Sequence, residues 1–136
     1  MTAPVLDTHA WVAWMLGSSD LAATERVALD SLPPDRRPFV SAISLWEVAM
    51  LVDLKRLSLD LPLADWLAGA THPRTVKVIP ITPAVAAGTA LLPPTFHRDP
   101  ADRIIVATCL ELEAPLATHD RLILKSRLVP RWRPGL

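Results

Sequence analysis

The sequence contains one cysteine, Cys109, so no disulfide can form within the chain. That cysteine lies in the apolar stretch 104–110, where a thiol behaves as a small core side chain. A chain without disulfides suits a reducing compartment, and we expect a cytoplasmic location. Segment 1–7 has no basic region before its apolar residues, and no apolar run reaches the length of a membrane span. The sequence therefore predicts neither a secretion signal nor a membrane anchor.

Glycine is scarce and charge is balanced. With four glycines in the chain, the sequence offers no glycine-rich phosphate loop. The four histidines, His9, His72, His97 and His119, lack the close spacing of zinc ligands, which argues against zinc hydrolysis. Lys plus Arg and Asp plus Glu each number 14, so the formal net charge is zero. Any contact with nucleic acid must therefore be local.

Apolar residues, in contrast, make up 51% of the 136 residues, enough for the core of one compact domain over 1–136. Short apolar runs predict strands at 4–6, 39–41, 76–81 and 115–118, with 128–129 as a last edge strand. Helical spacing or helix-start signals predict helices through Trp11 and Trp14, over 21–29, 45–52, around Trp66, over 84–91, from Pro100 to about Glu113, and over 121–124. This alternation predicts a three-layer α/β/α sandwich with a central parallel sheet of about five strands.

Ligands of such sheets bind at the carboxyl ends of the strands, and acids follow the strands at these points. Asp7 comes directly after the first strand, where a carboxylate is costly unless it is paired, coordinates a metal or caps the next helix. Glu47 follows the second strand, near the start of a helix. Because Ser44 stands three residues before it, the two also fit a capping box. Trp46 and Val48 indicate that this helix is buried on much of its surface.

Three further acids occur near predicted helix starts. Asp99 is placed to cap the helix that begins with Pro100, and Asp102 falls in its first turn. Asp102 is also in helical register with the apolar residues Ile105, Val106 and Cys109, so it is expected to face the sheet. Asp120 follows the strand 115–118 and can cap the short helix after it. Capping alone explains each acid separately, but it does not explain why several acids gather at one end of one sheet.

Like charges brought together destabilise each other unless a cation compensates them. Mg²⁺ or Mn²⁺ prefers carboxylate oxygens and keeps several bound waters. The acids therefore predict a divalent-metal site. Arg98, Arg103 and Arg121 flank them and are candidates for contacts with substrate phosphates, although salt bridges to the same carboxylates are an equal alternative.

Four segments, taken together, resemble the motifs of PIN-domain nucleases and, more narrowly, of bacterial VapC-type toxins. They are Leu6-Asp7-Thr8-His9-Ala10, the segment 40–49 around Trp46-Glu47, the segment 97–107 around Asp99-Pro100-Ala101-Asp102, and Leu116-Ala117-Thr118-His119-Asp120. The resemblance spans nearly the whole chain and follows the family's order.

The resemblance implies a metal-dependent endoribonuclease whose acidic quartet is Asp7, Glu47, Asp102 and Asp120, with Asp99 as an accessory acid and Thr118 as a supporting hydroxyl. It also implies an RNA substrate, a VapB-type antitoxin as partner and a homodimer. Trp11, Trp14, Trp46 and Trp66 are available for apolar interfaces, and core packing explains them equally well.

Other functions remain as alternatives. A haloacid-dehalogenase-type phosphatase requires a second aspartate two positions after the first, and His9 stands there. A non-catalytic binding module, in which the acids only cap helices, is favoured if the protein binds no divalent metal. A metal-dependent phosphoesterase acting on DNA is the third alternative.

Overall fold

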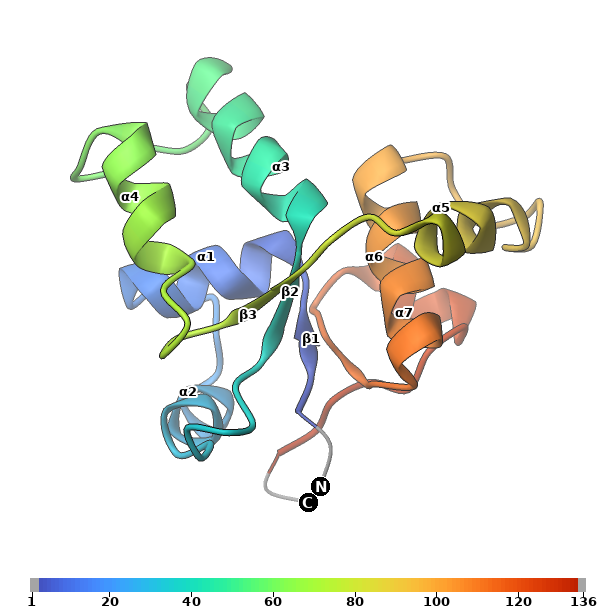
Figure 1. Cartoon of the computed structure of the whole chain (residues 1–136), viewed down its shortest axis with the longest axis horizontal. Helices are drawn as coiled ribbons and strands as arrows, with labels where there is room; N and C mark the ends of the chain where they lie inside the picture. Colours follow the sequence, from blue (N-terminus) through green and yellow to red (C-terminus); the bar gives the residue numbers. More distant parts are fainter. Residues whose placement is uncertain (1–2, 135–136) are drawn as a thin grey trace.

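The computed structural model describes residues 3–134 as a parallel sheet between two layers of helices (Figure 1). Within these residues the sheet has four strands in the order β3-β2-β1-β4, and every pairing is parallel. The strands are β1 (Val5–Leu6), β2 (Phe39–Ser41), β3 (Lys77–Ile79) and β4 (Leu116–Ala117). The helices are α1 (Thr8–Leu16), α2 (Ala23–Asp30), α3 (Ala42–Asp53), α4 (Leu63–Ala70), α5 (Pro83–Ala90), α6 (Pro100–Leu112) and α7 (Arg121–Ser126). The predicted α/β/α sandwich is confirmed.

Successive residues of each strand point to opposite faces of the sheet and enter two separate cores. Leu6, which is paired in register with Val40 and Ala117, packs in the core that contains the buried residues of α1, α2 and α4. Val5, in register with Leu116, packs in the core that contains α6 and Ile123 of α7. Both faces are therefore covered, and the carboxyl ends of the strands share one edge of the sheet, where the candidate acids follow them.

The tryptophans divide between the core and the surface. Trp11, Trp14 and Trp66 are buried, and the rings of Trp11 and Trp66 lie 5.3 Å apart. The indole of Trp11 donates to the carbonyl of Ala70 at 3.1 Å, which ties α1 to the end of α4. Trp46, on α3, is 55% exposed. The expectation that Trp46 marks a buried part of this helix is therefore wrong.

Two predicted boundaries also differ. Helix α3 begins at Ala42 with Ser41 as its cap, so Ser44 lies inside the helix and Glu47 lies in the second turn. The capping box of Ser44 with Glu47 is therefore not formed.

The last extended pairing is a single bridge between Leu116 and Arg131, not a strand at 128–129. The hydrogen bonds beside this bridge run from the amide of Leu116 to the carbonyl of Pro130 and from the amide of Trp132 to the carbonyl of Leu116.

Among residues 3–134, every helix is too short or too polar to cross a membrane.

Candidate functional site

Asp7 follows β1 directly and is buried, with 5% of its surface exposed. One carboxylate oxygen accepts the amide of Ala10 at 2.7 Å and so caps α1, and the other accepts the hydroxyl of Thr118. Burial raises the pKa of Asp7 above its ordinary value of 3.8, against the lowering effect of these two hydrogen bonds. Asp7 is thus a helix cap, and it is also a carboxylate whose ionised form is not fully compensated by the protein.

Thr118 connects two of the predicted acids. Besides donating to Asp7, its hydroxyl accepts the amide of Asp120 at 3.0 Å, so it fixes the turn between β4 and α7. Asp120 caps α7 by accepting the amide of Ile123 at 3.0 Å. The supporting position predicted for Thr118 therefore corresponds to a buried hydroxyl between Asp7 and the backbone of Asp120.

Asp102 lies in the first turn of α6, which Asp99 caps as predicted by accepting the amide of Asp102 at 3.0 Å. The Oδ2 atom of Asp102 lies 2.7 Å from Nε2 of His97. Burial is the largest cause that raises the pKa of Asp102 from 3.8 to about 6, and His97 opposes it. Asp102 is consequently a second carboxylate whose charge is costly in this position.

Asp120 interacts electrostatically with both Asp7 and Asp102. Asp120 raises the pKa of both Asp7 and Asp102 by charge repulsion, and Asp99 adds to this effect on Asp102. Asp120 thus lies within electrostatic range of both of the other acids. Asp7 and Asp120 follow β1 and β4 at the carboxyl edge of the sheet, and Asp102 lies in the first turn of α6, close enough to Asp120 for their charges to repel.

Glu47 is connected to this group only indirectly. It is half-buried on α3, one turn after the buried Ser44, whose hydroxyl accepts that of Thr8 at 2.9 Å. Thr8 follows Asp7 in the chain, so Glu47 lies on a helix that is held directly beside the first acid. The contacts of residues 3–134 include no hydrogen bond or ion pair that uses the carboxylate of Glu47.

Across the described part of the chain, 3–134, no three His, Cys, Asp or Glu side chains converge as a ready-made metal cage. The donor set nevertheless fits Mg²⁺ or Mn²⁺, because it consists of carboxylates and these ions complete their coordination with water. A buried carboxylate with a raised pKa next to two other acids is also a position where a cation lowers the free energy.

The three arginines that flank the acids differ in their surroundings. Arg98 and Arg121 are exposed at the starts of α6 and α7. Arg103 is half-buried, and its guanidinium donates to the carbonyls of Thr89, Phe96 and His97. These bonds favour a structural role for Arg103, whereas the exposed pair stays available to a phosphate.

Sequence reasoning missed two histidine–carboxylate contacts. One is His97 with Asp102, and the other joins Nε2 of His119 to Oε1 of the buried Glu25 at 2.8 Å. Glu25 comes from α2, 94 residues away from His119, so no local spacing announces the pair. His97 stands five residues before Asp102 across a predicted helix cap, and that spacing was a usable signal.

A groove of about 560 Å³ borders the acids. Its polar lining residues are Asp7, His9, Ser18, Asp20, Arg56, His119 and Asp120. Its apolar lining comes from α1 and the loop after α3, namely Ala10, Val12, Ala13, Leu16 and Leu57. The candidate site thus opens onto a surface that is partly apolar.

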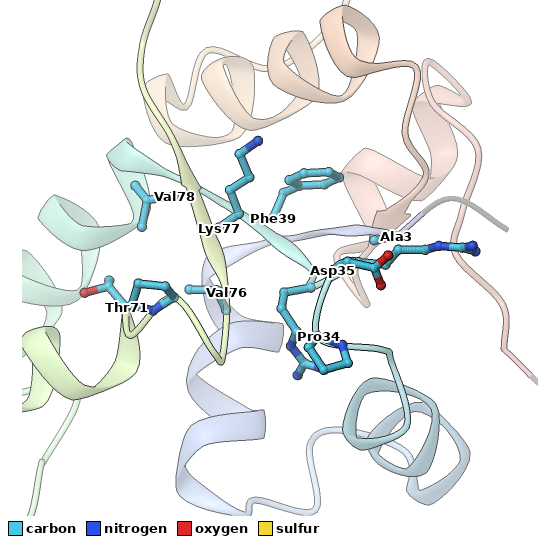
Figure 2. A pocket seen from close by; sticks show the side chains of 11 residues that line it. Ala3, Pro34, Asp35, Phe39, Thr71, Val76, Lys77 and Val78 are labelled. Atoms are coloured by element: carbon cyan, nitrogen blue, oxygen red, sulfur yellow. The ribbon is translucent and has the colours of Figure 1, made fainter.

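A second cavity, of about 710 Å³, lies at the opposite end of the strands (Figure 2). Its lining includes Phe39 and Lys77, which are the first residues of β2 and β3, and Ala3, which precedes β1. Because the predicted acids follow the other ends of the strands, this cavity is separate from the candidate site.

Comparisons with known proteins give one family match and one similar sequence. Residues 5–125 match the family model described as PIN domain. The chain is 39% identical over 132 residues, 96% of both chains, to a protein of Mycobacterium tuberculosis (strain ATCC 25618 / H37Rv) named Ribonuclease VapC22.

Two solved structures share the fold. One is described as FitAB bound to the IR36 DNA fragment, with a TM-score of 0.66, 21% identity and coverage of 94% of this chain and 92% of that chain. The other is a toxin–antitoxin complex from Klebsiella pneumoniae, with a TM-score of 0.59, 20% identity and coverage of 87% of both chains.

Proposed function

Because this chain belongs to the PIN-domain family, we propose that it is a metal-dependent endoribonuclease and the toxin of a toxin–antitoxin pair. The observation that carries the proposal is that Asp7 and Asp120 follow β1 and β4 at one edge of the sheet, with Asp102 within electrostatic range of Asp120, in a chain with a ribonuclease relative along nearly its full length. A protein with one buried thiol and no disulfide would act in the reducing cytoplasm.

Asp7, Asp102 and Asp120 would hold one or two Mg²⁺ or Mn²⁺ ions, with Glu47 reaching a second ion or the attacking water. A bound divalent ion supplies a water of lowered pKa and neutralises charge at the phosphate. The protein's own contribution is to keep these carboxylates fixed and partly dry. Thr118 and the amide of Ala10 orient Asp7, so that the side chain does not need to reorganise when substrate arrives.

Arg98 and Arg121 would contact the phosphates of RNA on either side of the site. Both are exposed beside acids that hold the proposed ions, at the starts of α6 and α7. Two cations give a local attraction in a protein whose formal net charge is zero, so binding is expected to weaken as salt is raised.

The proposed antitoxin would be a VapB-type protein that occupies the groove beside Asp7. A groove lined by apolar side chains of α1 and by the acids Asp7, Asp20 and Asp120 fits a peptide segment that carries both apolar and basic side chains. The toxin–antitoxin complex among the structural neighbours supports such a partner by its fold. Occupation of the groove would also cover Asp7 and Asp120 and so block the substrate.

The proposed homodimer would use the outer face of α3. Trp46 and Met50, with Leu54 at the C-cap, recur at helical spacing along this face, and Trp46 and Leu54 are 55% and 50% exposed. A large exposed aromatic flanked by apolar side chains is typical of the centre of a protein interface. The remaining interface candidates, Trp11, Trp14 and Trp66, are buried in the core.

Cleavage of RNA by the purified, antitoxin-free protein tests the enzymatic proposal. We expect a mixed RNA pool to be cut in the presence of Mg²⁺ or Mn²⁺ and to stay intact with EDTA or with the Asp7→Asn, Asp102→Asn double variant. A single-stranded DNA pool of matched sequence serves as the control for the DNA alternative. Intact RNA with the metal-loaded wild type would move the interpretation to a binding module, and cleavage of DNA alone would move it to a deoxyribonuclease.

Sedimentation equilibrium of the wild type and Trp46→Arg tests the dimer. We expect the dimer dissociation constant to rise by more than about tenfold in the variant, because a charged side chain replaces a tryptophan that the proposed dimer would bury. Val27→Arg is the matched control, since Val27 is 64% exposed on α2, away from the outer face of α3. A monomeric wild type, or a Trp46→Arg variant that dimerises as well as Val27→Arg, would rule out this interface.

A further inference from the structure

His97 makes the side-chain contact that orients Asp102. Its Nε2 atom lies 2.7 Å from Oδ2 of Asp102, and 22% and 20% of the two side chains are exposed. A carboxylate has no hydrogen to donate, so in this contact Oδ2 of ionised Asp102 accepts and the N–H of the imidazole donates. Within residues 3–134 no other side chain hydrogen bonds to this carboxylate. Its rotation therefore depends on His97.

The backbone of His97 is itself fastened to α6. Arg103, the residue after Asp102, donates to the carbonyls of Phe96 and His97 at 3.2 Å each and to that of Thr89 at 3.0 Å. The ring of Phe96 is 5% exposed and lies 4.3 Å from the imidazole of His97, measured between ring centroids. The bonds from Arg103 fix the backbone of His97 to α6, and the ring of Phe96 contacts one side of the imidazole. The imidazole is thus fixed relative to the helix that carries Asp102.

We propose that His97 is a positioning residue of the metal site: it holds Oδ2 of Asp102 so that Oδ1 is presented to a divalent cation shared with Asp7 and Asp120. The inference rests on the proposed function for the presence of the cation. Carboxylates that ligate metals are commonly hydrogen-bonded by a further side chain, and loss of such a partner costs about 10- to 100-fold in metal affinity or activity. The bonds of Arg103 then have a function too, since they keep the imidazole in place.

Mn²⁺ binding to full-length protein, measured by calorimetry and by the electron paramagnetic resonance of free Mn²⁺, tests the proposal near neutral pH. In His97→Leu, which has no donor, we expect the Mn²⁺ dissociation constant to rise by about tenfold or more. In His97→Gln, whose amide can donate from nearly the same place, we expect most of the affinity to return. His72→Gln is the matched control, because His72 is exposed and only accepts the amide of Arg74 in a turn.

RNA cleavage at saturating Mn²⁺ separates positioning from direct chemistry. We expect His97→Leu to regain a substantial part of kcat once the ion is supplied in excess, while its midpoint in Mn²⁺ stays shifted. Unchanged Mn²⁺ affinity in a folded His97→Leu, or a loss in His97→Gln as large as that in His97→Leu, would overturn the proposal.

The wild type, measured in parallel, distinguishes this proposal from the proposed function. A wild type that binds Mn²⁺ but cuts no RNA contradicts the nuclease and leaves the role of His97 to be decided by the variants. A wild type that binds no Mn²⁺ overturns both.

Discussion

Replacing Asp7 with Asn is expected to lower RNA cleavage by a factor on the order of 10³ while the protein stays folded. Asparagine caps helices as well as aspartate does, so the bond from the amide of Ala10 can be kept. The amide removes the charge that the proposed cation needs. It also removes a buried carboxylate whose pKa burial raises, so the metal-free variant should be at least as stable as the wild type.

The cleavage rate and the melting temperature of the same preparation, in EDTA for the melt, measure both effects. Asp65→Asn is the matched control, since Asp65 is an exposed acid in the first turn of α4 and lies outside the site. We expect its cleavage rate to match that of the wild type. If Asp7→Asn retained cleavage within tenfold of the wild type, Asp7 would be only a helix cap.

Most of the fold could be predicted because local signals agreed with the tertiary structure. The apolar run before Asp7 and the pair Asp99-Pro100 predict β1 and the start of α6 correctly. Such signals are strong because backbone geometry and capping act within a few residues. The parallel arrangement followed from short apolar strands alternating with helices.

The start and the orientation of α3 could not be read in this way. Both Ser41 and Ser44 have a hydroxyl suited to an N-cap, but Ser41 caps the helix and the hydroxyl of Ser44, inside it, contacts Thr8, 36 residues away. Trp46 and Val48 are both apolar, yet one is exposed and the other is fully buried. When apolar residues occur around the whole helix, periodicity does not indicate which side faces the core.

The positions of the candidate acids in the fold could be predicted, and their supporting contacts could not. Asp7 and Asp120 follow strands and Asp102 lies in the first turn of a helix, as the sequence predicts, and their assignment to a site rests on the rule that parallel sheets bind ligands at the carboxyl ends of their strands. Thr118 was found only through a family resemblance, and its bonds to Asp7 and Asp120 explain why a hydroxyl suits this position. The pairing of His119 with Glu25 depends on how α2 packs, which no short motif encodes.

The stability of the metal-free protein is expected to fall as the pH rises from about 4 to about 6.5, through the ionisation of Asp102. Its pKa is about 6 in the folded protein and near 3.8 in the unfolded chain, so the folded protein binds the proton more tightly. The stabilising contribution of the protonated carboxyl is therefore fully present below about pH 3.8 and is lost as the pH rises through about 6. This difference in pKa corresponds to at most ~3 kcal/mol, and partial exposure of the side chain reduces the expected effect to about 1–2 kcal/mol.

Urea unfolding in EDTA at the two pH values, for the wild type and Asp102→Asn, isolates this effect. We expect the free energy of unfolding of Asp102→Asn not to show this decrease between the two pH values. The variant should therefore be more stable than the wild type at the higher pH and not at the lower one. Added Mg²⁺ should restore the wild type at the higher pH and leave the variant nearly unchanged, because the ion compensates the charge that the variant no longer carries. Parallel changes in the two proteins between the two pH values would mean that Asp102 ionises near its ordinary pKa. The carboxylate would then be well solvated, and a cation at this site would relieve no buried charge on Asp102.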